Sequence, residues 1–511
     1  MMKSLMRRRP LCLLATLALA AGCGVLVPFV PETITRLFLD GSAGAVGMNL
    51  FSAVQVDPRS EDSAGPKIIA TGDIDGDGLT DIASGWNISN PIQLHFQRRI
   101  NGSVSFETIT LAGDTPTRFV ADMAIADFDG DGRNDLAVLV KHTGFFATCR
   151  LTGDAAESED ALDGVIIVYF APADPNDTTN PLAWEDVPLN LSRAAGAGPE
   201  NLDAPEEGGY TDLEVADING DGTPDLVVAW NADECEGPVN VIEYFVNPGP
   251  DTARQRSAWA DIVMFANSPL VKSLTVFDVD RDGDLDVAFT TPSGGAQNIQ
   301  WTRNPRIDIP DAFHLTDGTW QTGSVGEVRS GADVLASGDI DGDGITDIVV
   351  RSTEGRLIQW FKGPQNPTTT PVRNLPWQVF TIAEFTDRIP EAIALGDLDG
   401  DGELELAASA QGAVIWLDPF PGGSVFDQWQ ERLLIDDTPV DNPRPALTDP
   451  NVNPDEVVVS TTLINQLRVV DLDGDGRLDV LSTLDREGQS GLTNDAIIWF
   501  RNTLFDDTTG E

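Results

Sequence analysis

The sequence contains short acidic loops whose carboxylates are spaced to bind a cation. In the first loop Asp73, Asp75, Asp77 and Asp81 occupy positions one, three, five and nine. A glycine holds position six, where a chain that turns around an ion needs a residue tolerant of positive φ. The main-chain carbonyl of position seven, Leu79, and water would complete the coordination shell. This spacing predicts a calcium loop.

Six further copies follow, which makes chance a poor explanation. Their predicted ligands, with the position-seven carbonyl fourth in each set, are Asp127, Asp129, Asp131, Arg133 and Asp135; Asp217, Asn219, Asp221, Thr223 and Asp225; Asp278, Asp280, Asp282, Asp284 and Asp286; Asp339, Asp341, Asp343, Ile345 and Asp347; Asp397, Asp399, Asp401, Glu403 and Glu405; and Asp471, Asp473, Asp475, Arg477 and Asp479. The sequence thus predicts about seven Ca²⁺. Three loops depart from the pattern: Asn219 replaces a carboxylate and predicts a weaker third site, Arg281 replaces the position-four glycine, and Glu405 replaces the last Asp.

A helix-flanked EF-hand begins with the same spacing but needs a bidentate Glu at position twelve. Short strand-like segments precede and follow the loops, which also disfavours the EF-hand. The residues at position twelve are Ser84, Val138, Val228, Phe289, Val350, Ala408 and Ser482. None of these supplies that ligand.

The formal net charge of −50 excludes unaided binding of nucleic acid through its phosphates. Two like charges about 4 Å apart repel by about 4 kcal/mol at an effective dielectric constant near 20. Clustered loop carboxylates should therefore resist ordering without metal, and we expect the cation to be part of the fold.

The loops recur at intervals of 54, 90, 61, 61, 58 and 74 residues, which is the period of a supersecondary repeat. Six repeats contain four segments of strand length and the seventh contains three, with the acidic loop between the first and the second. Aromatic residues recur near the end of the third segment, where we expect packing between sheets. These third-segment tryptophans are Trp301, Trp360, Trp416 and Trp499.

Four-stranded units of this length suit a β-propeller or a stacked array. The seventh unit lacks a fourth strand, whereas residues 50–56 form a strand without a unit. A ring in which this N-terminal strand completes the last blade explains both observations and removes open sheet edges. We therefore predict an all-β, seven-bladed β-propeller over residues 50–511.

With strands on both sides of each loop, the repeats resemble the FG-GAP and VCBS-type blades of the integrin-α-like propeller superfamily. The resemblance covers residues 50–502 and is closer to the bacterial VCBS form, because the Phe-Gly pair before the first strand is absent. It implies a calcium-stabilised propeller that is extracellular or envelope-bound and serves as a binding or adhesion scaffold.

Residues 1–22 are typical of an export signal, with basic residues followed by an apolar run too short to span a bilayer. The signal ends at Cys23, in a stretch that resembles the bacterial lipobox. This predicts a lipid-anchored protein with a tether over residues 23–49; plain secretion is the alternative. Gly24 in place of Asp favours the outer membrane. Cys149 and Cys235 fall in the connections between second and third strands of neighbouring blades, which predicts a disulfide.

The three histidines, His95, His142 and His314, lie in different repeats without a shared spacing, and no nucleophile elbow or zinc-ligand cluster occurs. We therefore predict a non-enzymatic, monomeric binding module whose ligand is an extracellular or envelope protein or glycan. A propeller enzyme acting on polysaccharide or phosphoester is the alternative, because some propellers related to the family that these repeats resemble cleave polysaccharides. The residues themselves leave such chemistry unsupported, since nearly all paired carboxylates are assigned to calcium. The long connections 141–163, 193–210 and 436–460 are the predicted recognition segments.

Overall fold

The computed structural model describes residues 51–58, 66–86, 92–100, 102–111, 120–140, 166–189, 208–232, 240–268, 271–291, 298–306, 320–328, 331–365, 377–386, 389–410, 413–419, 425–426, 429–434, 462–486 and 496–503. Regular structure in these ranges consists of β-strands and two short 3₁₀ turns, η1 (Pro175–Asp177) and η2 (Arg256–Ala258). Within the same ranges, no helix has the length and hydropathy needed to cross a bilayer.

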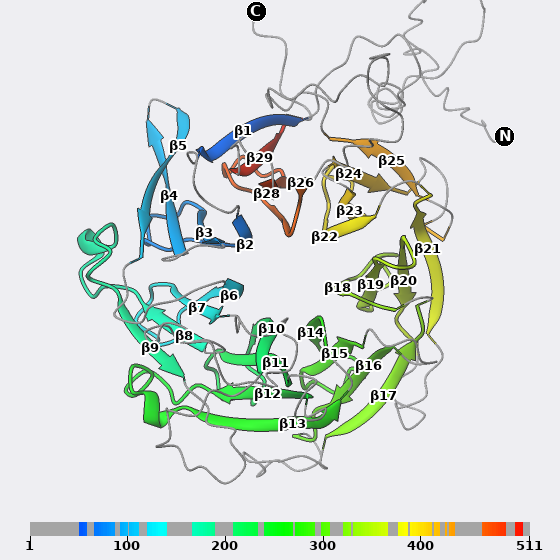
Figure 1. The fold of residues 1–511 in the computed structure, drawn as a ribbon, viewed down its shortest axis with the longest axis horizontal. Coiled ribbons are helices and arrows are strands. Elements are labelled where there is room, and N and C mark those ends of the chain that lie inside the picture. Colours follow the sequence, from blue (N-terminus) through cyan, green and yellow to red (C-terminus); the bar gives the residue numbers. More distant parts are fainter. Residues whose placement is uncertain are drawn as a thin grey trace, which may run out of the picture. The chain divides into compact units, whose positions relative to one another are not determined.

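The strands form seven sheets arranged as a ring (Figure 1). We number these sheets as blades one to seven in the order of their acidic loops. Six blades each contain four consecutive antiparallel strands. These are β2 (Pro66–Gly72), β3 (Asp81–Trp86), β4 (Ile92–Ile100) and β5 (Ser103–Thr110); β6 (Val120–Ala126), β7 (Asp135–Val140), β8 (Ile166–Phe170) and β9 (Glu185–Leu189); β10 (Gly208–Ala216), β11 (Asp225–Ala232), β12 (Asn240–Val246) and β13 (Ala260–Ser268); β14 (Leu274–Phe277), β15 (Asp286–Thr290), β16 (Ile299–Arg303) and β17 (Gln321–Gly326); β18 (Val334–Gly338), β19 (Asp347–Ser352), β20 (Leu357–Lys362) and β21 (Gln378–Glu384); and β22 (Pro390–Gly396), β23 (Glu405–Ala410), β24 (Ala413–Asp418) and β25 (Gln430–Leu433). The predicted seven-bladed β-propeller is confirmed.

Blade seven contains β27 (Leu467–Val470), β28 (Asp479–Arg486) and β29 (Ala496–Asn502). Strand β1 (Phe51–Pro58) pairs antiparallel with β29, with Phe51 opposite Asn502 and a register shift after Gln55. A two-residue strand, β26 (Thr462–Leu463), pairs with the far end of β28.

The hydrophobic core lies between neighbouring blades. One cluster combines Phe96 of blade one with Tyr169 of blade two, and both side chains are buried. The third-strand tryptophans, predicted to pack between sheets, are all buried: Trp301, Trp360, Trp416 and Trp499 are at most 3% exposed. Each blade therefore covers an apolar face that it could not cover alone.

The first strands of the blades surround a central cavity of about 500 Å³. Hydrogen bonds across this inner ring join consecutive blades. The Leu213 N–H donates to Asp122 Oδ2 (3.0 Å), the Leu274 N–H to Asp212 Oδ2 (2.6 Å), and the Ile69 N–H to Gln466 Oε1 (2.5 Å). The last of these bonds joins blade seven to blade one.

Acidic side chains that line this cavity include Asp122, Asp212 and Glu214. Because of them, we expect the stability of the fold to depend on pH. Burial raises the pKa of Glu214 to about 7, helped by the charge of Asp122 and opposed by that of Arg468. Burial and the neighbouring Asp122 raise the pKa of Asp212 well above its usual value. A carboxyl group whose pKa is higher in the folded state binds more protons there than in the unfolded chain, so folding stability falls as the pH rises.

Between pH 4.5, the usual pKa of Glu, and about pH 7, the raised pKa of Glu214, the free energy of unfolding of the wild type should fall by about 3 kcal/mol because of this group. We expect Glu214→Gln to remove this part of the pH dependence. Urea unfolding midpoints at pH 5 and pH 8, in excess Ca²⁺, measure the effect. The exposed Asp251 supplies the matched control, Asp251→Asn, whose profile should follow the wild type. Identical pH profiles for the wild type and Glu214→Gln would contradict the prediction.

Candidate metal centre

Each acidic loop joins the first strand of a blade to the second. In all seven blades, position nine of the loop is the first residue of the second strand. In blade one, for example, the loop lies between Gly72, which ends β2, and Asp81, which begins β3. The prediction that strands flank these loops is confirmed, and the helix-flanked EF-hand arrangement is excluded.

Two glycines and one carboxylate set the conformation of a loop. Gly76 and Gly78, at positions four and six, have φ values of 77° and 83°, which disfavour side chains. The Gly78 N–H donates to Asp73 Oδ2 (2.9 Å), and the equivalent bond from position six to position one recurs in every loop. This bond turns the loop back on itself and gathers its carboxylates.

Arg281 departs from the glycine rule at position four. Its φ of 56° lies in the left-handed region, which is unfavourable for a residue with a Cβ. Its guanidinium group compensates by donating to the Pro364 and Gln365 carbonyls of blade five, at 3.2 and 2.8 Å. The Arg281 side chain therefore links the loop of blade four to blade five.

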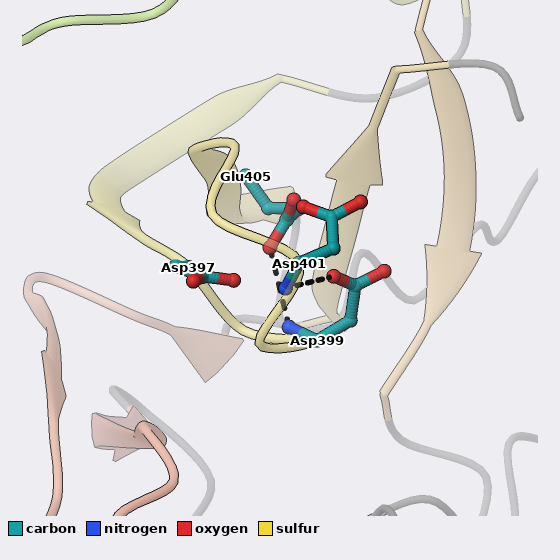
Figure 2. Close-up of side chains that lie close together, drawn as sticks. All are labelled: Asp397, Asp399, Asp401 and Glu405. Carbon is teal, nitrogen blue, oxygen red and sulfur yellow. Dashed lines mark hydrogen bonds between the residues drawn. The ribbon is translucent and has the colours of Figure 1, made fainter. Parts of the chain in front are cut away.

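Several Asp-rich groups could hold metal ions. In each group, one oxygen per residue lies within 4.8 Å of the others. A group of four is on the loop between β22 and β23, where Figure 2 shows Asp397, Asp399, Asp401 and Glu405 together. Further groups are Asp73, Asp75 and Asp81; Asp127, Asp129 and Asp135; Asp278, Asp280 and Asp282; and Asp339, Asp341 and Asp347.

The donor atoms fit a hard divalent cation. All are carboxylate oxygens, which Ca²⁺, Mg²⁺ and Mn²⁺ prefer and which thiophilic metals do not. Asp280 Oδ1, Asp341 Oδ1 and Asp397 Oδ1 are buried and accept no hydrogen bond within the described structure. A buried oxygen without a donor is costly, and coordination to a cation would remove that cost.

The position-nine carboxylate has a second role, because it ties the hairpin to the third strand. In blade four, Asp286 Oδ2 accepts the Val279 N–H (3.0 Å) and Oδ1 accepts the Asn304 N–H (2.8 Å). Burial raises the pKa of these carboxyl groups despite the backbone donors: to about 7 for Asp81, Asp135, Asp225 and Asp347, and to about 6 for Asp479.

Side-chain amides in the C-terminal part of the third strand, or directly after it, link neighbouring loops. The Asn304 Nδ2 donates to the Leu285 carbonyl of its own loop (3.0 Å) and to the Ile218 carbonyl of the loop in blade three (2.9 Å). Asn247, Asn502 and Gln97 make the same two bonds between blades three and two, seven and six, and one and seven. We call these four residues the amide bridges.

Basic side chains contact the carboxylates at positions three and five. Arg98 Nη1 lies 2.7 Å from Asp75 Oδ2, and Arg254 Nη2 lies 2.7 Å from Asp129 Oδ2. In blades four, five and seven the base stands at the end of the third strand, where Arg303, Lys362 and Arg501 contact the same two positions of their loops. An incoming cation would have to displace these groups or share the carboxylates with them.

Blade six differs from blades four and seven both in the residue at the end of its third strand and in the residue that follows the basic position. The residue at the end of its third strand is Asp418, and the next is Pro419, which has no N–H to donate. Glu405 Oε2 accepts the Leu398 N–H (2.6 Å) and the Asp399 N–H (3.3 Å). Burial, and then the charge of Asp399, raise the pKa of Glu405 to about 9.

The structure brings the predicted residues of positions one, three, five and nine together in blade six. In blades one, two and five the group contains positions one, three and nine, and in blade four it contains positions one, three and five. At position seven the structure shows an additional contact: the Leu79 N–H donates to Asp77 Oδ1 (2.9 Å), a bond that recurs from position seven to position five in every loop. In the third loop Asn219 Oδ1 accepts the Asp221 N–H (2.8 Å), and its weaker site stays a prediction. Cys23, Cys149 and Cys235, with the predicted anchor and disulfide, lie outside the described residues.

The amide bridges and the basic residues at the loops were not predicted from the sequence. A weak signal was present, because an Asn or Gln stands in or directly after several third segments, and Asn247 and Asn304 precede proline. Such a pair is also typical of an ordinary turn, so the signal did not distinguish the two.

Comparison with known proteins finds a match to the FG-GAP-like repeat family over residues 64–138, 217–289 and 339–408. No curated protein matches the chain. A solved structure of the Dos1 propeller is similar, with a TM-score of 0.43, 10% sequence identity, and coverage of 88% of this chain and 95% of that chain.

Proposed function

Because this chain is a β-propeller with FG-GAP-like repeats, we propose that it is a calcium-stabilised binding and adhesion scaffold of the bacterial cell envelope. The observation that carries the proposal is the set of acidic loops, one before the second strand of each blade. In blades one, two, four, five and six, three or four carboxylates of the loop lie close enough together to share an ion. The metal role in this proposal is structural. Ca²⁺ would offset the repulsion within each loop and fix the loop's conformation.

Calcium would be held by the carboxylates at positions one, three, five and nine, together with the position-seven carbonyl predicted from the sequence. It would supply positive charge that the loops otherwise take in part from Arg and Lys. The buried oxygens of Asp341 and Asp397 that accept no hydrogen bond from the described part of the chain support this assignment.

The proposed scaffold is non-enzymatic. Its support includes His95, which is fully buried and hydrogen-bonded through both ring nitrogens, to Ser84 Oγ (2.8 Å) and Thr108 Oγ1 (2.9 Å). A buried imidazole with both nitrogens engaged suits packing better than proton transfer to a substrate. His142 and His314 lie outside the described residues.

We further propose that Cys23 carries a lipid that anchors the chain to the outer membrane as a monomer. Recognition of an envelope or extracellular protein or glycan is assigned to the long connections 141–163, 193–210 and 436–460. Exposed loops on a rigid scaffold commonly hold binding residues, which is the physical basis for this assignment.

A binding experiment tests this function. The full chain, loaded with Ca²⁺, is applied to a glycan array and used to capture proteins from native envelope extract. We expect a ligand that is retained with Ca²⁺ and lost in excess chelator. A matched screen on polysaccharide and phosphoester substrates should give no turnover. Turnover without a retained ligand would replace the scaffold by the enzyme alternative.

A further inference from the structure

The central cavity has the size and the mixed lining of a small-molecule site. Its volume of about 500 Å³ is enclosed by the first strands of the blades (Figure 1). Small-molecule sites typically occupy about 300–1,000 Å³. Apolar side chains such as Met123, Leu274 and Ile393 line it together with charged groups. The lining residues lie outside both the acidic loops and the long connections, so the cavity is a separate candidate site.

The blade-seven side of the cavity presents hydrogen-bond donors. Arg468 lines the cavity from β27, and its guanidinium group makes no hydrogen bond or ion pair within the part of the chain that the structure describes. Burial raises the pKa of Asp122, and the charge of Arg468 opposes this rise across the cavity. Beside Arg468, the Nδ2 of Asn465 is buried and donates no hydrogen bond to any described residue. These donors suit a carboxylate, which a guanidinium group binds through two parallel bonds.

The opposite side of the cavity presents carboxyl groups. Glu214 lines it from β10 of blade three, which lies across the ring from blade seven (Figure 1). Among the described residues its carboxyl group accepts no hydrogen bond. Asp122 and Asp212 hydrogen-bond to each other through their side chains, and Lys272 is already paired with Asp333 (2.6 Å). An ammonium group beside Glu214 would therefore meet a carboxylate that no protein donor satisfies.

We propose that the central cavity binds a short peptide with both termini free, with the peptide carboxylate at Arg468 and the peptide ammonium group at Glu214. The two side chains form no ion pair with each other in the described structure, so one ligand that carries both charges can bond to both. A metal cation would be repelled by Arg468, and an inorganic anion by Glu214. The proposal does not depend on the calcium function, and it gives the scaffold a binding site besides the long connections.

Titration with a dipeptide and its blocked forms tests the proposal. Alanyl-alanine is titrated into the full chain loaded with Ca²⁺, and the heat of binding is recorded by calorimetry. A pH of about 7.5 keeps most of Glu214, whose pKa is about 7, ionised and most of the peptide ammonium group, whose pKa is about 8, protonated. We expect saturable binding of the dipeptide. N-acetylalanyl-alanine and alanyl-alaninamide, which each lack one charge, should bind at least about tenfold more weakly.

Two variants assign the ends of the peptide to their partners. Arg468→Met removes the guanidinium group and keeps an apolar stem. It should weaken binding of the dipeptide at least about tenfold and abolish the difference between the dipeptide and its amide. Glu214→Gln should instead abolish the difference between the dipeptide and its acetylated form. This crossed pattern is not expected from a general loss of packing.

Matched controls are available on the surface. Arg99 and Asp251 are exposed, and Arg99→Met and Asp251→Asn should leave all three titrations unchanged. If Arg468→Met does not fold, as judged by circular dichroism, Arg468→Lys replaces it. Lysine keeps the charge without the planar pair of donors, so it should weaken binding of the dipeptide by about fivefold and leave binding of the amide unchanged.

Three results would overturn the proposal. The first is the absence of saturable binding of alanyl-alanine. The second is equal binding of the dipeptide and either blocked form by the wild type, which would show that the cavity recognises only one charge. The third is unchanged binding in folded Arg468→Met, or in Arg468→Lys where that variant is needed, which would place the peptide elsewhere. None of these results bears on the calcium function, which chelation tests separately.

Discussion

Chelation of divalent cations should lower the melting temperature of this protein by several degrees or more. A ligand that binds only the folded state stabilises it by about 2.7 kcal/mol per site at a concentration 100 times its Kd. Several loops contain converging carboxylates that repel one another without a cation, and buried oxygens of Asp280, Asp341 and Asp397 accept no hydrogen bond from the residues that the structure describes. Scanning calorimetry of the full chain with excess Ca²⁺, and then with excess chelator, measures the shift.

Restoring Ca²⁺ after chelation should recover the original melting curve. Raising the ionic strength with a monovalent salt should recover it only in part, because screening weakens repulsion without supplying a ligand to the buried oxygens. The same melting temperature with and without chelator would show that the loops do not need metal, and would remove the structural role assigned to calcium.

The second large effect is expected from the position-nine carboxylate of blade four. In excess chelator, Asp286→Ala should lower the free energy of unfolding by about 3–5 kcal/mol, because it leaves the buried N–H groups of Val279 and Asn304 without acceptors. Asn304→Ala should cost less, about 1–3 kcal/mol, by leaving the Ile218 and Leu285 carbonyls without that donor. Urea unfolding followed by intrinsic fluorescence provides the measurement.

The matched control is Asp77→Ala, which removes an exposed position-five carboxylate of blade one. Its partners are the Leu79 N–H and, at 3.4 Å, the Arg98 guanidinium group, so the cost without metal should stay below about 1 kcal/mol. In Ca²⁺ the same variant should weaken binding, because it loses a predicted ligand. Equal destabilisation by Asp77→Ala and Asp286→Ala in chelator would show that position nine has no special role in the hairpin.

The sequence was sufficient to predict the blades and the place of each loop. Both features are periodic along the chain: carboxylates recur at fixed offsets, and strand-length segments recur around them, so a single repeat can be checked against six others. The third-strand tryptophans could be assigned to packing for the same reason. Local pattern and global fold agree here, which is the condition under which such predictions succeed.

The amide bridges and the basic residues that contact the loops could not be predicted, because they depend on which blades are neighbours and on strand register. Asn304 donates to a carbonyl 86 residues earlier in the chain, in another blade. The change from Asp to Glu at position 405 was visible in the sequence. The hydrogen bonding of Glu405 could not be predicted. It depends on Pro419, which follows β24, the strand paired with β23, and has no N–H to donate.

Six of the seven sheets consist of strands that are consecutive in the chain. Each of these blades can pair its strands as soon as its own segment is free to fold, with little entropy lost in closing loops. The interfaces between blades, which contain the hydrophobic clusters, form only when two neighbours are complete. Folding in chain order should therefore proceed blade by blade, and an incomplete ring would expose two apolar faces, that of the newest blade and the face of blade one that packs on blade seven. The other faces are already covered, which limits aggregation before the ring is complete.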